Sequence, residues 1–354
     1  MKKKALVAMS GGVDSSIAAY LTLKEGYDAV AATIYTGNYS CGGEEDSCAA
    51  GRAVEDARAV AKVLGIEHYT LDLSGQFRKC VVDYFVNTYI SGQTPNPCVE
   101  CNRHIKFGAL LDFALNQGAT KIVTGHYARV ANENGRYLLK KAKDPAKDQS
   151  YVLWRLSQRQ LSHIYFPLAD FRKQEVREMA AALGLVTAKK QESQDICFIP
   201  DSDYAAFIEK AAGRVSPPGD FIDTSGRVLG RHRGLIHYTT GQRKGLGLSL
   251  GEPMYVRSKD PEKNTVTLCR EPELYSKRLV ARQINLIAAD TLPGPVRVGA
   301  KTRYSQREVP AVVCQTGEDE FVVEFDTPVR AVTPGQSVML YDGNTVLGGG
   351  IIVE

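Results

Sequence analysis

The first 200 residues alternate short apolar runs with stretches of helical spacing, and this alternation restricts the possible folds more than any other feature. Apolar runs at 4–9, 28–35, 67–73 and 120–127 are interleaved with helix-like stretches at 15–26 and 48–65. Continuous apolar strands between helices are typical of a parallel sheet covered by helices on both faces. We therefore expect an α/β domain whose ligands bind beyond the carboxyl ends of the strands.

The pattern changes after about residue 215. Residues 216–234 are rich in turn formers, and alternating strands dominate from residue 280 onward. Asp342-Gly343 lies between two apolar runs and predicts a hairpin turn. A chain of 354 residues is long enough for two or three domains. We expect an α/β catalytic domain at 1–210, a small central linking domain at 211–280 and an antiparallel β-barrel at 281–354.

Composition and charge describe an ordinary globular protein. The chain is 44% hydrophobic, and its net charge of +4 permits a nucleic-acid partner without requiring one. The first apolar run ends at Ser10, too early for an export signal, and no run approaches the roughly 20 apolar residues of a membrane span. We expect a cytoplasmic protein. Its eight cysteines should be mostly reduced there, so a close pair favours metal binding or catalysis.

The stretch "VAMSGGVDSS" at 7–16 follows the first predicted strand and opens the first predicted helix. Two glycines allow a tight turn, and a helix N-terminus offers free N–H groups to a phosphate. The stretch fits neither the dinucleotide pattern G-x-G-x-x-G nor the Walker pattern G-x-x-x-x-G-K-[ST]. A phosphate loop without the Walker lysine is not obviously built for γ-phosphoryl transfer. The alternative is an ordinary Gly-Gly turn.

Two segments carry cysteines in promising settings. Cys98 and Cys101 lie in "TPNPCVECNRHIKFG" at 94–108, and Cys197 lies in a polar, turn-like run at 189–201. Cys101 precedes an apparent helix, whose dipole and N–H groups would lower the pKa of the thiol, so Cys101 is the candidate nucleophile. The other cysteines are expected to be buried or uninvolved, although Cys48 adjoins a glycine-rich loop: Cys41, Cys48, Cys80, Cys269 and Cys314.

The S-G-G-x-D-S pattern resembles the loop of the PP-loop ATP pyrophosphatases, which have an adenine-nucleotide α-hydrolase-like fold. With six further segments, the whole chain resembles the MnmA/TrmU-type tRNA-uridine 2-sulfurtransferases. These segments are 95–107, 147–153, 191–199, 239–248, 301–306 and 333–343. The resemblance implies that ATP, with Mg²⁺, adenylates the C2 oxygen of the wobble uridine (position 34) and releases pyrophosphate. Sulfur then replaces that oxygen to give 2-thiouridine.

The resemblance also implies partners: tRNAs such as those for Lys, Glu and Gln, and a sulfur donor protein or sulfide. Asp14 would hold Mg²⁺ or orient pyrophosphate, Cys101 would be the nucleophile, and Cys197 would carry sulfur as a persulfide. The uridine, flipped out of its stack, would be bordered by Asn96, Pro97 and Cys98. ATP would contact Ala8, Met9, Ser10, Gly11, Gly12, Val13, Asp14, Ser15, Ile34 and Gly125. The tRNA would contact His126, Lys147, Asp148, Gln149, Arg303, Tyr304 and Gln336.

Cys98 departs from the family pattern, in which most members carry an aspartate thought to assist proton transfer. Two interpretations are open. Cys98, Cys101 and Cys197 could hold an oxygen-labile [4Fe–4S] cluster with one iron open to sulfide. Alternatively, Cys101 and Cys197 act through a persulfide, and Cys98 is a spare thiol. Zinc with His104 as fourth ligand is less favoured, because a closed site leaves no reactive thiolate.

Other functions remain as alternatives. The chain could be a different PP-loop ATP pyrophosphatase, such as a small-molecule synthetase or another tRNA-modifying enzyme. It could also be an RNA-binding protein without catalysis. A small-molecule synthetase needs neither the second cysteine segment nor the β-rich tail, and the intact phosphate loop argues against an inactive protein.

Overall fold

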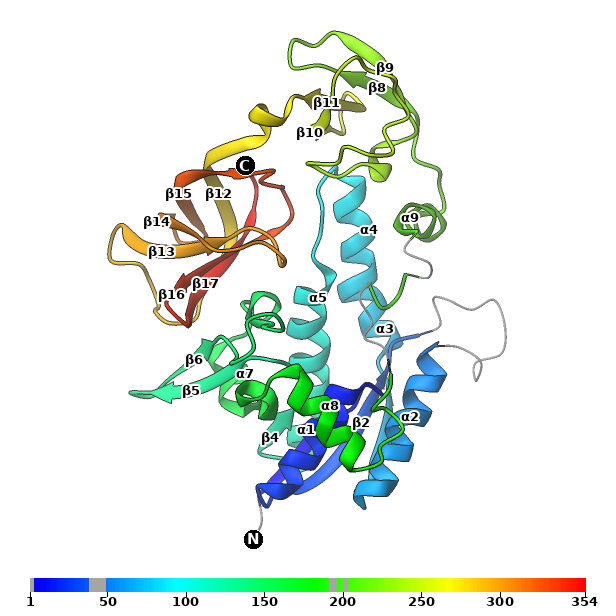
Figure 1. Cartoon of the computed structure of the whole chain (residues 1–354), viewed down its shortest axis with the longest axis vertical. Helices are drawn as coiled ribbons and strands as arrows, with labels where there is room; N and C mark the ends of the chain where they lie inside the picture. The colour runs from blue at the N-terminus through cyan, green and yellow to red at the C-terminus, as the bar shows by residue number, and fades with distance from the viewer. Residues whose placement is uncertain (1–2, 38–48, 191–195, 200–202) are drawn as a thin grey trace. The chain divides into compact units, whose positions relative to one another are not determined.

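The computed structural model describes residues 3–37, 49–190, 196–199 and 203–354 (Figure 1). Two compact units can be separated. The first contains Met1–Val81, Cys98–Ser202 and Asn344–Val346, and the second contains Val82–Pro97, Asp203–Gly343 and Leu347–Glu354. Cys41 and Cys48 lie outside the described residues. No helix within the described ranges is long and apolar enough to span a membrane.

The first unit is built on a five-stranded parallel sheet in the order β3-β2-β1-β4-β7, which confirms the predicted α/β fold. β1 lies between β2 and β4, so the strand order changes direction beside it. In open parallel sheets such a point is where ligands bind, beyond the carboxyl ends of the strands. The strands are β1 (Lys4–Ala8), β2 (Asp28–Tyr35), β3 (His68–Asp72), β4 (Lys121–Val123) and β7 (Ile164–Tyr165).

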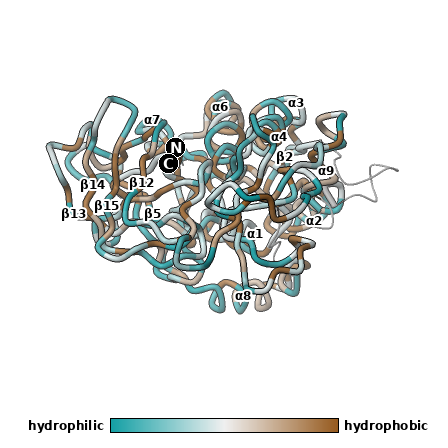
Figure 2. The backbone as a smooth tube through the Cα atoms, turned by 90° about the horizontal axis from the view of Figure 1, so that it is seen from above, coloured by the Kyte–Doolittle hydropathy of each residue, from teal (hydrophilic) through white to brown (hydrophobic). Residues whose placement is uncertain are grey.

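Helices cover both faces of this sheet. Ala5 and Val7 of β1 pack with α1 (Val13–Lys24), α2 (Ala49–Leu64) and α8 (Lys173–Ala182) in one apolar core. Figure 2 shows α1 and α8 on one side of β2, and α6 (Leu110–Asn116) on the other. The remaining elements of this unit are α3 (Ser74–Phe77), β5 (Arg129–Glu133), β6 (Arg136–Lys140), α7 (Gln158–His163), and the short helices η4 (Ser150–Val152) and η5 (Pro167–Asp170).

The predicted strand at 120–127 is shorter than expected, because β4 ends at Val123. The chain then passes close to the first turn of α1. A Cβ atom on Gly125 would lie 2.7 Å from the backbone atoms of Asp14 and Ser15, so only glycine fits there. This close approach takes residues 124–127 out of the sheet.

The segment with Cys98 and Cys101 forms one continuous helical run. It begins with α5 (Pro97–Glu100), becomes π-helical over Cys101–Ala109 (η3) and continues into α6. Proline suits the first helical position, because it has no N–H that needs a partner there. The helix therefore starts before Cys98, one turn earlier than the sequence suggested. π-Helical turns are rare and occur frequently at functional sites.

The second unit contains a four-stranded sheet and a closed antiparallel barrel, and the barrel confirms the prediction for the C-terminal residues. The four-stranded sheet has the order β10-β11-β8-β9 around Phe221, Tyr238 and Val256. Its elements are β8 (Gly219–Ile222), β9 (Val228–His232), β10 (Tyr255–Asp260) and β11 (Thr265–Cys269). The helical elements nearby in sequence are α4 (Asp83–Ile90), which follows the π-helical turn η2 (Arg78–Val82), α9 (Tyr204–Ala212), η7 (Leu235–His237) and η8 (Glu271–Leu274).

Six strands form the barrel in the order β12-β15-β14-β13-β16-β17, and pairing of β12 with β17 closes it. Buried and exposed residues alternate along β15, as expected for a strand with one face toward the barrel interior and the other toward solvent. The predicted hairpin joins β16 to β17. The predicted boundaries at 210/211 and 280/281 fall inside α9 and β12. The strands are β12 (Tyr275–Leu286), β13 (Val296–Lys301), β14 (Val309–Gly317), β15 (Glu320–Arg330), β16 (Ser337–Asp342) and β17 (Thr345–Ile352).

Candidate active site

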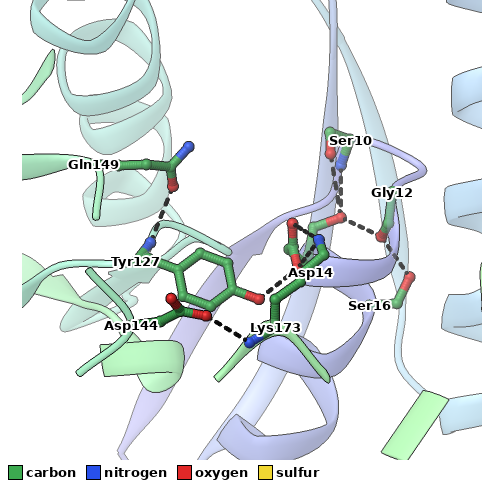
Figure 3. A network of polar contacts seen from close by, with 9 residues as sticks. Ser10, Gly12, Asp14, Ser16, Tyr127, Asp144, Gln149 and Lys173 are labelled. Atoms are coloured by element: carbon green, nitrogen blue, oxygen red, sulfur yellow. Dashed lines mark hydrogen bonds and ion pairs between the residues drawn. The ribbon is translucent and has the colours of Figure 1, made fainter. Parts of the chain in front are cut away.

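The loop between β1 and α1 is braced by its own hydroxyl groups (Figure 3). Ser10 N donates to Ser15 Oγ (3.1 Å), while Ser15 Oγ and Ser16 Oγ both donate to Gly12 O (3.0 and 2.9 Å). Gly11 has φ +67°, and a Cβ atom there would lie 2.4 Å from Ala53 O. The N-cap residue of α1, Gly12, makes no side-chain cap, and the first N–H groups of a helix are a favourable site for an anion.

Asp14, the predicted Mg²⁺ ligand, is engaged by two side chains that the sequence did not single out. Lys173 Nζ lies 2.7 Å from both carboxylate oxygens, and Tyr127 Oη donates to Oδ1 at 2.9 Å. Figure 3 shows the Lys173 side chain reaching from the start of α8 to Asp14. A lysine that lies 159 residues from its partner leaves no local sequence pattern.

The network continues to the segment at 147–149. Gln149 Oε1 accepts from Tyr127 N (3.0 Å), and Gln149 N donates to Tyr127 O (2.8 Å). Asp148 accepts from Ala142 N (3.0 Å) and from Ser150 Oγ (2.6 Å). Lys147 and Ile34 are half-buried. Two predicted tRNA contacts, Asp148 and Gln149, thus shape the backbone beside the phosphate loop.

The three thiols, all in the first unit, lie within electrostatic range of one another. Cys98 and Cys197 are exposed and Cys101 is half-buried. Desolvation by the surrounding protein nevertheless raises the pKa of all three, that of Cys197 to about 12. The charge of neighbouring thiolates adds to the rise at Cys101 and Cys197, whereas Lys106 opposes it at each sulfur.

The predicted lowering of the Cys101 pKa is therefore wrong. Cys101 lies one turn inside the helix, away from the free N–H groups of its first turn, and desolvation is the largest influence on its thiol. Cys98, directly after Pro97, occupies the N-terminal position that the sequence assigned to Cys101. Cys197 lies in a turn, as predicted.

Among the described residues, no three His, Cys, Asp or Glu side chains are placed to hold one metal ion. His104 Nε2 instead lies 3.3 Å from Glu100 Oε2, which argues against a zinc site with His104. In a cubane cluster each thiolate binds a different iron, so the three sulfur atoms need not surround a single metal position. Three soft thiols in one unit suit such a cluster in their chemistry.

The segment before Cys98 is held by a loop of the second unit. Gln336 Nε2 donates to Thr94 O and Pro95 O, both at 3.0 Å, and Thr94 N donates to Pro334 O at 2.9 Å. A Cβ atom on Gly335, which has φ +89°, would lie 2.8 Å from Thr94 N. These contacts fix the backbone that leads into Asn96 and Pro97.

Two other predicted tRNA contacts also have internal partners. Arg303 Nη2 donates to Thr240 O (3.0 Å), Ala331 O (3.0 Å) and Thr333 Oγ1 (2.8 Å). His126 is buried against Phe107 and Phe166, and desolvation lowers its pKa well below the usual value, so its ring is neutral. Tyr304 is exposed.

Three family models match the chain in succession. The tRNA methyl transferase HUP domain matches residues 3–201, the tRNA methyl transferase PRC-barrel domain 205–270, and the aminomethyltransferase beta-barrel domain 276–352. A tRNA-specific 2-thiouridylase MnmA from Acetivibrio thermocellus is 50% identical over 356 residues, with 99% of each chain covered. Proteins of the same name from Halothermothrix orenii (99% of each chain covered) and Clostridioides difficile (99% and 98%) are 49% and 45% identical.

The solved structures that match this chain are more distant. A 4-thiouridine synthetase in complex with RNA and ATP is 19% identical, with a TM-score of 0.36 over 60% of this chain and 50% of that one. The U34-tRNA thiolase NcsA of Methanococcus maripaludis, solved with its [4Fe–4S] cluster, is 17% identical, with a TM-score of 0.35 over 60% and 65%. The full-length relatives and the family models show that the chain belongs to the family of the MnmA-type tRNA-specific 2-thiouridylases.

Proposed function

We propose that this protein catalyses the ATP-dependent 2-thiolation of the wobble uridine of tRNA. The main support for this proposal is the 45–50% sequence identity, over nearly the whole chain, to relatives named tRNA-specific 2-thiouridylases. The α/β sheet, the lysine-free phosphate loop and the three thiols of the first unit agree with this activity. A small-molecule synthetase or a different tRNA-modifying enzyme would not account for relatives of this name along the full length.

In the first step, the loop after β1 binds ATP. Residues 8–15 surround the phosphates, with Ile34 and Gly125 beside adenosine. Asp14 would hold Mg²⁺, which favours carboxylate and phosphate oxygens. The uridine C2 oxygen attacks the α-phosphorus, the bond to the β-phosphate breaks, and pyrophosphate leaves. AMP is now attached through the C2 oxygen and becomes a good leaving group.

Sulfur reaches C2 in the second step. In the persulfide route, the terminal sulfur on Cys197 attacks C2, and AMP departs. Cys101 then attacks the Cys197 sulfur, forming a Cys101–Cys197 disulfide and leaving the transferred sulfur on the base. In the cluster route, Cys98, Cys101 and Cys197 would hold a [4Fe–4S] cluster, and the chemistry that it would supply is delivery of sulfide.

The substrate and its contacts complete the proposal. The uridine is bordered by Asn96, Pro97 and Cys98, and tRNAs such as those for Lys, Glu and Gln supply it in the cytoplasm. The tRNA is bound through residues 126, 147–149, 303–304 and 336. The chain keeps the predicted division into a catalytic domain (1–210), a linking domain (211–280) and a barrel (281–354), with the two limits moved to the ends of α9 and β12, which they cut.

The test is a thiolation assay with ATP, Mg²⁺, a sulfur source and tRNA. We expect 2-thiouridine by nucleoside mass spectrometry, together with AMP and pyrophosphate formed only when tRNA is present. Formation of ADP and phosphate, or pyrophosphate release with a small acceptor in place of tRNA, would contradict the proposal.

The two sulfur routes are separated by anaerobic reconstitution. The cluster route predicts iron and acid-labile sulfide in the wild type and their loss in Cys98→Asp. The persulfide route predicts full thiolation by iron-free protein with a persulfide donor alone. Protein purified in air cannot distinguish the routes, because oxygen destroys such clusters.

A further inference from the structure

The phosphate loop lacks the lysine of a Walker loop, yet the fold places a lysine beside it. Lys173 is the first residue of α8, and it is 8% exposed. Its Nζ atom lies 2.7 Å from both oxygens of Asp14, which stands in the first turn of α1 directly after the loop. Neither the sequence patterns nor the resemblance assigned a role to this residue.

The lysine is held in a defined position. Asp144 Oδ2 accepts from Lys173 N (3.0 Å) and fixes the start of α8, and the Tyr127 ring lies 5.9 Å from Nζ (Figure 3). A buried and oriented cation loses little side-chain entropy when an anion arrives. Lys173 is therefore prepared for a ligand at the start of α1.

A purely structural role is a weak explanation for this pair. Desolvation of the buried Lys173 ammonium group and the half-buried Asp14 carboxylate offsets much of their attraction, so such a pair contributes little net stability. Lys190, at the same loop, has the contacts expected of a structural lysine. Its Nζ donates to Gly11 O (3.0 Å) and pairs with Asp56 (2.5 Å), and its side chain is 39% exposed.

We propose that Lys173 binds the β- and γ-phosphates of ATP and afterwards the released pyrophosphate, an inference that rests on the proposed function. Asp14 holds the lysine when no nucleotide is present. When Mg²⁺ and ATP arrive, the carboxylate turns to the metal ion, and the ammonium group turns to the phosphates. The lysine missing from the loop is thus supplied by α8.

The test compares the affinities of Lys173→Gln for ATP, pyrophosphate and AMP by calorimetry, without tRNA. Glutamine keeps a hydrogen-bond donor for Asp14 but loses the charge. We expect the affinities for ATP and pyrophosphate to fall roughly 10- to 100-fold, the range of a charged hydrogen bond, and that for AMP to change less than about twofold. Lys173→Arg should retain most of the affinity for ATP. Lys143→Gln is the matched control, because Lys143 pairs with Glu175 of the same helix at the surface.

Unchanged affinity for ATP, or an equal fall for ATP and AMP, overturns the inference. If Lys173→Gln does not fold, Asp14→Asn/Lys173→Gln is compared with Asp14→Asn, since neither leaves the half-buried Asp14 carboxylate without its lysine. The same selective loss is then expected. Nucleotide binding needs neither tRNA nor sulfur, so absence of 2-thiouridine in the wild type would refute the proposed function without touching this result.

Discussion

Single residues show how burial controls the chemistry of the three thiols. Desolvation raises the pKa of Cys98, Cys101 and Cys197, so each remains protonated around pH 7. Lys106 opposes this rise at all three sulfurs. Because the thiolate is the reactive form, the resting cysteines should be poor nucleophiles until a sulfur donor, a metal or tRNA changes their surroundings.

We predict slow, strongly pH-dependent alkylation of these cysteines. A raised pKa leaves little thiolate below the ordinary cysteine value of about 8.5, and reaction at Cys197 should increase up to about pH 12. Mass spectrometry of anaerobically reduced, iron-free protein treated with iodoacetamide at several pH values measures this. Lys106→Met should slow alkylation further. A half-maximal rate at Cys101 below pH 8 would contradict the prediction.

Residue types in the loop and cysteine segments could be identified from the sequence, but their partners could not. Asp14 was recognisable from its pattern, whereas Tyr127 and Lys173 come from distant segments joined by the fold. The pKa of Cys101 was predicted in the wrong direction, since burial depends on packing that no local pattern records.

At the scale of elements, the hydrophobic periodicity of the sequence predicted the sheet and the barrel correctly, but it predicted the ends of individual helices and strands less well. β2 and the β16–β17 hairpin were predicted, because strand pattern and turn chemistry agree there. The start of α5 at Pro97 was missed, because the helix was expected only after Cys101, whereas Pro97 serves as the first helical residue. The end of β4 depends on contact with another segment.

The contact of the Pro334–Gln336 loop with residues 94–95 yields a prediction for Gln336→Glu. A carboxylate cannot donate to the carbonyls of Thr94 and Pro95 and repels both, so the segment before Cys98 should shift. We expect kcat for thiolation to fall about tenfold or more, the free energy of unfolding to fall about 1–3 kcal/mol, and ATP binding to stay unchanged.

Steady-state thiolation kinetics and chemical denaturation measure these effects. Gln315→Glu is the control, because its amide donates to Gly317 O within β14 and so loses one donor without touching residues 94–95. An increase in KM for tRNA with unchanged kcat would show that Gln336 serves as a tRNA contact instead.

At the scale of the whole molecule, tRNA binding must be separated from folding. The net charge of +4 is small, so affinity depends on where the cations lie. Arg303 ties three segments of the second unit together through Nη2. Arg303→Ala should therefore lower the melting temperature as well as tRNA affinity, and it is a poor probe of phosphate contact alone.

Variants of Tyr304 and Lys147 distinguish the contribution of base stacking to tRNA binding from that of charge. Tyr304 is 44% exposed, so Tyr304→Ala should leave the melting temperature unchanged and weaken tRNA binding by about 1–3 kcal/mol, the range of a lost base–aromatic stack. Its salt dependence should match the wild type, since no charge is removed. Lys147→Met should instead reduce the slope of log K against log salt by about one. Filter binding at several salt concentrations checks both. A change of slope in Tyr304→Ala, or none in Lys147→Met, would contradict this division, because only a phosphate contact releases counterions on binding.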